Sequence, residues 1–248
     1  AAPAAVPGLR PGLARWPLKV QEGDEFLLIG DSLMQGVSWA LERDFKKRGL
    51  KSVNISKSST GLVNTKYFDW PATLEKQLDS SASRYVVVML GANDPWSFYA
   101  GKKFFKLGSE EWREEYGRRV GEIFRLAAEH HARVIWFEVP PMRQAGYSAK
   151  IELLNQVYED VTRRYGGYFV RTHHAFSSDG SYVQYGRDAR GALKKVRADD
   201  GIHFTMLGAS IISAVLMRDL QVGEGTLEAA SSGDAGSAQA AVKPQPDS

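Results

Sequence analysis

Short apolar segments alternate with helical patterns along most of the chain, and this alternation limits the possible folds more than any other feature. Residues 26–29, 85–90 and 134–139 are almost continuously apolar. A strand that is apolar on both faces is buried on both faces, which is typical of parallel sheets. Strands that alternate with helices indicate a parallel sheet that is covered by helices on both sides.

The predicted elements follow one another in a regular order. We expect strands over residues 26–29, 52–56, 85–90, 134–139 and 168–170, and helices over residues 32–48, 109–131, 149–165 and 205–220. This order predicts an α/β protein, a three-layer α/β/α sandwich with a parallel sheet in the flavodoxin-like style. In such sheets, ligands bind at the carboxyl ends of the strands.

The two ends of the chain differ in composition from its middle. Residues 1–22 are predicted to be an extended lead-in, because repeated prolines block helices and central strands. Residues 23–220 form the predicted domain, and residues 221–248 are expected to be disordered because they contain few large apolar groups. The opening residues contain no continuous apolar segment, so they are not a signal peptide, but they fit what remains after one is removed.

The composition excludes several classes of protein. Hydrophobic residues make up 43% and charged residues 25% of the 248 residues, as in soluble globular proteins. The sequence contains no run of eighteen apolar residues, so we expect no transmembrane segment. The absence of cysteine excludes disulfides, a thiol nucleophile and thiolate metal sites. Basic and acidic residues are interleaved, so the net charge of +3 does not predict a nucleic-acid partner. The oligomeric state is left open.

Polar segments follow three of the predicted strands. The sequence GDS at residues 30–32 begins a helix, where the Ser32 hydroxyl would lie at the sheet edge beside free backbone N–H groups. The alternative is a serine that only caps the helix. The sequences SSTG at residues 58–61 and GAND at residues 91–94 follow two further strands, and each alone also fits a simple turn.

A carboxylate and an imidazole lie just before the last predicted helix. Asp200 and His203 are three residues apart, so one short turn can bring the carboxylate to the ring nitrogen that does not face a serine. The alternative is a capping carboxylate beside an incidental histidine. Asp199 is a competing acid, and the spacing favours Asp200.

The other histidines are weaker candidates. His130 and His131 end a predicted helix, whereas His173 and His174 follow a short strand but lack a carboxylate three residues upstream. Adjacent histidines point apart, so neither pair is a ready metal site. We therefore predict no metal and no cofactor.

The four polar segments occur in the order Ser, Gly, Asn, Asp-x-x-His, and together they resemble the four blocks of the SGNH (GDSL-like) hydrolase superfamily. Residues 91–120 also resemble the DUF459 branch. The resemblance implies that Ser32 is the nucleophile, that Gly61 and Asn93 donate to the oxyanion, and that Asp200 and His203 act as acid and base of a triad.

Two features depart from common superfamily members. Met34 stands where those members have a hydroxyl residue after GDSL. Residues 95–108 are longer than a simple turn and contain five aromatic side chains, which are predicted to shape or cover the pocket.

The resemblance also implies an activity and a location. It predicts a serine esterase that hydrolyses short, acetyl-type esters, with cell-envelope glycans as substrates and an acyl-enzyme as intermediate. The alternatives are an O-acyltransferase that uses the same triad and a non-catalytic carbohydrate-binding or assembly protein. Because the resembling DUF459 proteins are mostly exported, we expect a periplasmic or secreted protein.

Overall fold

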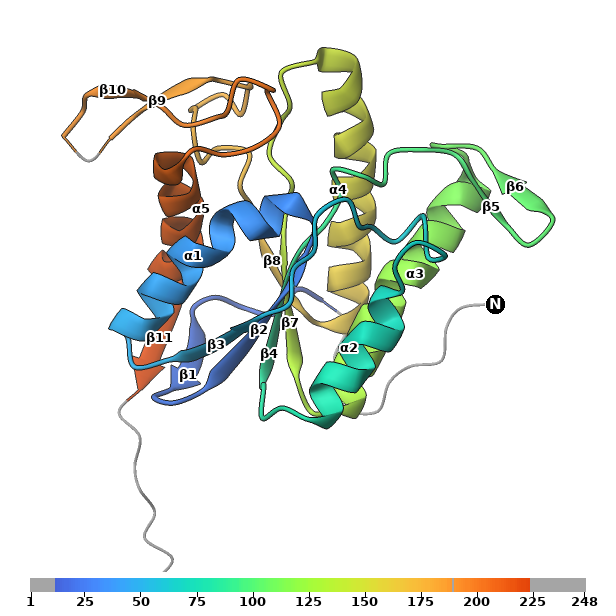
Figure 1. Cartoon of the computed structure of the whole chain (residues 1–248), viewed down its shortest axis with the longest axis horizontal. Coiled ribbons are helices and arrows are strands. Elements are labelled where there is room, and N and C mark those ends of the chain that lie inside the picture. The colour runs from blue at the N-terminus through green and yellow to red at the C-terminus, as the bar shows by residue number, and fades with distance from the viewer. Residues whose placement is uncertain (1–11, 189, 224–248) are drawn as a thin grey trace, which may run out of the picture.

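A parallel sheet forms the centre of the computed structural model, which describes residues 12–188 and 190–223. Within these residues its five strands have the order β3-β2-β4-β7-β8, and all neighbours are parallel (Figure 1). The strands are β2 (Glu25–Gly30), β3 (Lys51–Asn54), β4 (Tyr85–Met89), β7 (Arg133–Phe137) and β8 (Tyr168–Val170). All five residues of β4 are buried, as its continuous apolar character predicts.

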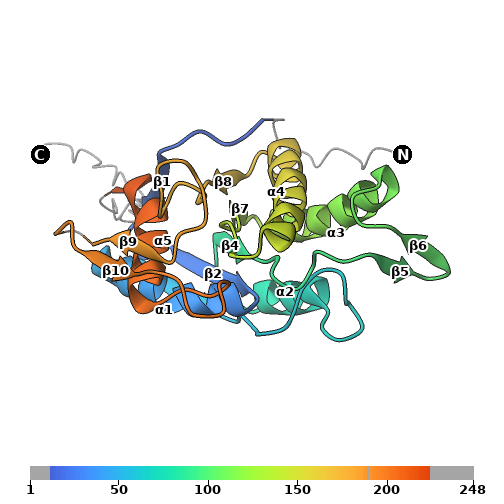
Figure 2. The same cartoon turned by 90° about the horizontal axis from the view of Figure 1, so that it is seen from above.

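Helices cover both faces of this sheet. Helices α1 (Ser32–Lys47) and α5 (Met206–Arg218) pack together on one face. Helices α2 (Trp70–Asp79), α3 (Glu110–Glu129) and α4 (Ala145–Tyr165) lie side by side on the other face (Figure 2). The predicted three-layer α/β/α fold is confirmed.

Capping residues explain where several helices begin. Asp31, Ser109 and Thr205 each accept a hydrogen bond from the first turn of α1, α3 and α5. Helix α4 begins at Ala145, four residues before the predicted start at residue 149. This first turn contains Gly146 and Ser148, which have low helix propensity, so the sequence did not indicate that the helix begins there.

Among the described residues, three pairs of short strands lie outside the central sheet, and the sequence did not predict them. Strands β5 (Phe98–Ala100) and β6 (Lys103–Phe105) form a hairpin, as do β9 (Tyr185–Arg187) and β10 (Leu193–Lys195). Strand β1 (Leu18–Gln21) pairs in parallel with β11 (Leu220–Gly223).

The β1–β11 pair extends the folded part beyond the predicted limits of 23–220. Residues 18–21 belong to the predicted lead-in, and residues 221–223 belong to the predicted tail. In β1 the side chains of Leu18 and Val20 are buried, which explains why this strand joins the fold. The remainder of the lead-in, residues 1–11, and of the tail, residues 224–248, lies outside the described residues. Within the part that the structure describes, no helix is long and apolar enough to cross a membrane.

Candidate active site

The turn between β2 and α1 places Ser32 at the carboxyl edge of the sheet. Gly30 is required in this turn, because a Cβ atom there would collide with the carbonyl oxygen of Met89 and with Met34. Ser32 is the first residue of α1, so its backbone N–H has no acceptor within the helix and is free for an anion.

A chain of hydrogen bonds joins the three residues that the sequence predicted as a triad. The Oδ2 atom of Asp200 lies 2.6 Å from Nδ1 of His203. The Nε2 atom of His203 lies 2.8 Å from Oγ of Ser32. The Oδ1 atom of Asp200 also accepts the backbone N–H groups of Ile202 at 2.8 Å and His203 at 3.0 Å, which fixes the short turn before α5.

These contacts set the protonation of the site. Partial burial opposes ionisation of Asp200, but the hydrogen bonds from the His203 ring and from the turn outweigh it and lower the pKa of Asp200 to about 2. The charged Asp200 holds a proton on Nδ1 of His203, so Nε2 is left to accept the proton of Ser32. Asp199 instead meets Nζ of Lys195 at 2.6 Å and Nε2 of Gln184 at 3.0 Å.

Gly61 and Asn93 lie on loops that follow β3 and β4, beside the strand that leads to Ser32. One N–H of the Asn93 amide donates to the carbonyl oxygen of Thr60 at 2.9 Å, which ties the two loops together. The second amide hydrogen has no partner among the described residues, and neither has the backbone N–H of Gly61. A side chain at Gly61 would collide with the carboxylate of Asp94.

A buried carboxylate beside Ser32 positions the loop that carries Asn93. The Oδ2 atom of Asp31 accepts the backbone N–H groups of Gly91 and Ala92, each at 3.0 Å. Its Oδ1 atom accepts the N–H of Leu33 at 2.8 Å. Burial, helped by the nearby charge of Asp94, raises the pKa of Asp31 to about 6, although these three N–H donors favour its charged form.

A second buried carboxylate, Asp94, positions the loop that carries Gly61. It accepts the backbone N–H groups of Leu62 at 2.8 Å and Val63 at 2.9 Å, and the hydroxyl of Tyr116 at 2.8 Å. Burial raises the pKa of Asp94 as well. The sequence alone indicates no such role for Asp31 or Asp94, because either residue also fits a turn and most of its partners lie far away in the chain.

Comparison with solved structures identifies the fold. A GDSL-like lipase from Bacteroides thetaiotaomicron is similar with a TM-score of 0.56 and 17% identity, over 79% of this chain and 86% of that chain. The psychrotrophic esterase EstA from Pseudoalteromonas sp., in a structure inhibited by monoethylphosphonate, is similar with a TM-score of 0.53 and 15% identity, over 79% of this chain and 96% of that chain. A third similar structure is a protein from Slackia heliotrinireducens whose name places it among the SGNH hydrolases. Its TM-score is 0.57 and its identity 13%, over 79% of this chain and 98% of that chain.

The chain therefore has the SGNH hydrolase fold, and its site residues occupy the carboxyl edge of the sheet. Within this class it belongs to the DUF459 family, described as a protein of unknown function, whose profile matches residues 25–219. The predicted family is confirmed. No curated protein matches the chain.

Proposed function

We propose that this protein is a serine esterase that hydrolyses short acyl esters through an acyl-enzyme on Ser32. The observation that carries the proposal is the continuous hydrogen-bonded chain from Asp200 through His203 to Ser32. A serine with this arrangement has a base to remove its proton and an acid to orient that base. The names of similar structures, a lipase and an esterase, support ester hydrolysis.

The proposed reaction has two stages. His203 takes the proton of Ser32 as Oγ attacks the ester carbonyl carbon, and the tetrahedral intermediate collapses as His203 gives that proton to the leaving alcohol. Water then attacks the acyl-enzyme with His203 again as the base, which releases the acid and restores Ser32. Asp200 keeps the imidazole in the required tautomer and stabilises its charged form.

The oxyanion of each intermediate would be held by the N–H groups of Ser32 and Gly61 and by the free amide hydrogen of Asn93. Preorganised donors of this kind act mainly on the transition state. We expect Asn93→Ala to lower kcat by roughly 10²–10³ with little change in KM. Steady-state kinetics on 4-nitrophenyl acetate checks this, and an effect confined to KM would make Asn93 a substrate-binding group instead.

An acylated glycan is the substrate class that we favour. The side chains of His203 and Asp200 are 40% and 46% exposed, so the site is open to an ester that is attached to a large molecule. The loop with Asn93 leads directly into the aromatic segment 95–108, which suits short acyl groups beside sugar rings. Since such glycans belong to the cell envelope, we propose a periplasmic or secreted location.

The test is an assay of released acetate from 4-nitrophenyl acetate and from an acetylated glycan, each with and without a sugar acceptor. Ser32→Ala should reduce turnover to the small rate that the oxyanion donors alone support, and a fluorophosphonate should label Ser32. Ser80→Ala is the matched control, because Ser80 is exposed at the end of α2 and should leave the rate unchanged. An active Ser32→Ala variant, or a label on another serine, would refute the proposal, and transfer of acetate to the sugar would indicate an acyltransferase.

A further inference from the structure

A cavity lies at the carboxyl ends of β7 and β8, between the first turns of α4 and the loop 173–182. Its volume is about 460 Å³, within the range of about 300–1,000 Å³ that is usual for small-molecule sites. Ser32 and His203 do not line this cavity. Its walls combine apolar side chains such as Val139, Met142 and Ile151 with a few polar groups.

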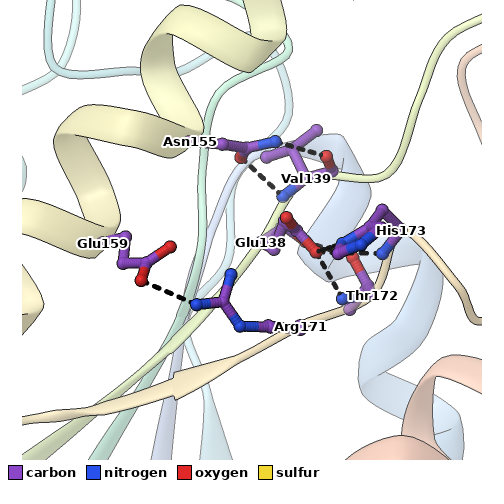
Figure 3. Close-up of polar contacts among 7 residues, drawn as sticks. All are labelled: Glu138, Val139, Asn155, Glu159, Arg171, Thr172 and His173. Atoms are coloured by element: carbon purple, nitrogen blue, oxygen red, sulfur yellow. Dashed lines mark hydrogen bonds and ion pairs between the residues drawn. The ribbon is translucent and has the colours of Figure 1, made fainter. Parts of the chain in front are cut away.

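His173 lines the cavity, and its imidazole ring is paired with the carboxylate of Glu138 (Figure 3). The Oε2 atom of the buried Glu138 accepts the backbone N–H groups of Thr172 at 2.6 Å and His173 at 2.9 Å. The same oxygen lies 2.8 Å from Nδ1 of His173. Because this contact places the proton of the neutral ring on Nδ1, Nε2 is left as a hydrogen-bond acceptor. It has no partner among the described residues.

The sequence did not reveal this pair. His173 lacks a carboxylate three residues upstream, but Glu138, directly after the neighbouring strand β7, supplies one. The adjoining wall is fixed as well, because the amide of Asn155 bonds both the N–H and the carbonyl oxygen of Val139 at 2.9 Å (Figure 3). The cavity is therefore built by side chains with fixed positions.

The rim of the cavity is attached to the turn that carries the proposed acid and base. The backbone N–H of Arg143 donates to the carbonyl oxygen of Gly201 at 3.1 Å. The buried guanidinium of Arg197 donates to the carbonyl oxygens of Pro141 at 2.8 Å and Ile202 at 2.7 Å. A molecule in the cavity would thus lie across one short turn from the proposed triad.

The polar groups of the cavity balance in charge and differ in kind. Among the groups that line the cavity, the charge of Arg143 is matched by that of Glu152. Arg143 offers donors and His173 an acceptor, while the hydroxyl of Tyr182 is buried without a partner among the described residues. Sugar hydroxyls both donate and accept hydrogen bonds and carry no charge, so they fit this set better than an anion or an acyl chain.

We propose that this cavity binds a neutral saccharide unit of the substrate, with a sugar hydroxyl donating to Nε2 of His173 and a second hydroxyl accepting from Arg143. This inference rests on the proposed function, since it makes the cavity a subsite for the glycan whose ester is cleaved at Ser32. The inference places recognition of the glycan at the carboxyl ends of β7 and β8, and the ester chemistry at the carboxyl end of β2.

Binding can be measured without turnover in the full chain with Ser32→Ala. The probes are the methyl glycosides of glucose, galactose, mannose and N-acetylglucosamine, with sulfate and octanoate as the competing ligand classes. We expect a saturable shift of the His173 ring nitrogen signals in NMR with at least one glycoside and none with sulfate or octanoate. Isothermal titration should then give an affinity for that glycoside.

Two variants and a matched control test the residues. His173→Phe keeps a flat ring but removes the acceptor, and Arg143→Met removes the donor from an exposed side chain. Each should weaken glycoside binding by about tenfold, whereas His130→Phe, at the far end of α3, should stay within about twofold. The proposal is overturned if no glycoside saturates, if sulfate or octanoate binds instead, or if both variants bind as tightly as the parent. Glycoside binding by a protein that hydrolyses no ester would refute the esterase proposal alone.

Discussion

Asp199 and Asp200 are adjacent and chemically identical, yet their partners give them different roles. Asp200 contacts the His203 ring, whereas the side chain of Asp199 is 83% exposed and pairs with Lys195. We expect Asp200→Asn to lower kcat by up to ~10⁴, because the amide no longer stabilises the required tautomer and the charged ring. Asp199→Asn should change kcat by less than about threefold, because it removes only an exposed ion pair. Ester hydrolysis kinetics on both variants decides between the two acids, and the reverse result would make Asp199 the acid.

The buried Asp31 predicts a pH dependence of stability. Burial raises its pKa from 3.8 to about 6, so the folded chain binds this proton more tightly than the unfolded chain. The resulting stabilisation is complete below a pH of about 3.8 and is lost as the pH rises through about 6, an effect of up to about 3 kcal/mol in the free energy of unfolding.

Asp31→Asn removes this titration, so the variant should lose less stability than the wild type between pH 4 and pH 7. Urea unfolding across that range measures the difference. Asp160→Asn, at an exposed position of α4 that has no ion pair among the described residues, is the control and should follow the wild-type curve. Parallel curves for Asp31→Asn and wild type would show that Asp31 does not titrate in this range.

At the scale of elements, the β5–β6 hairpin has one buried and one exposed aromatic face. Phe98 and Phe105 stack at 5.3 Å and are buried next to Trp112. Tyr99 and Phe104 pair at 4.9 Å on the other face and are 70% and 51% exposed. The aromatic side chains of residues 95–108 thus divide between core packing and a surface available to a ligand.

This division predicts different consequences for the two faces. Phe98→Ala should lower the free energy of unfolding by about 3–5 kcal/mol, because it leaves a cavity in the core. Tyr99→Ala and Trp96→Ala should lower turnover of an acetylated glycan more than turnover of 4-nitrophenyl acetate, because exposed aromatic faces suit sugar rings. Equal losses on both substrates would place these two residues outside substrate binding. A preference for octanoyl over acetyl esters would indicate a lipase-like role.

Elements with a strong pattern were predictable, and contacts between distant residues were not. The buried strands β4 and β8 are continuously apolar, so their positions follow from the sequence. Strand β10 has the sequence LKK and no apolar alternation, so no pattern indicates it. The order of the polar segments indicated Ser32 and His203, but the acceptor roles of Asp31 and Glu138 depend on partners that only the folded sheet brings near.

On the scale of the whole molecule, a strand near the start of the described chain pairs with a strand at its end. Leu18 lies opposite Leu220 in the parallel β1–β11 pair, and both side chains are buried. The N–H of Leu18 also donates to the carbonyl oxygen of Asp219 at the end of α5. The pair therefore joins the start of the fold to its last helix, so the limit of the folded domain at the carboxyl end should fall just after β11.

Two truncations test this limit. Deleting residues 225–248 should leave the melting temperature and ester hydrolysis unchanged, because their composition offers too little apolar area to offset an ordering cost of about 1–2 kcal/mol per residue. Deleting residues 220–248 also removes β11 and uncovers Leu18 and Val20. This second truncation should lower the melting temperature by about 10 °C. Differential scanning calorimetry of both proteins measures the contrast: a large loss in the first would show that the tail docks on the domain, and no loss in the second would show that β1 is stable without its partner strand.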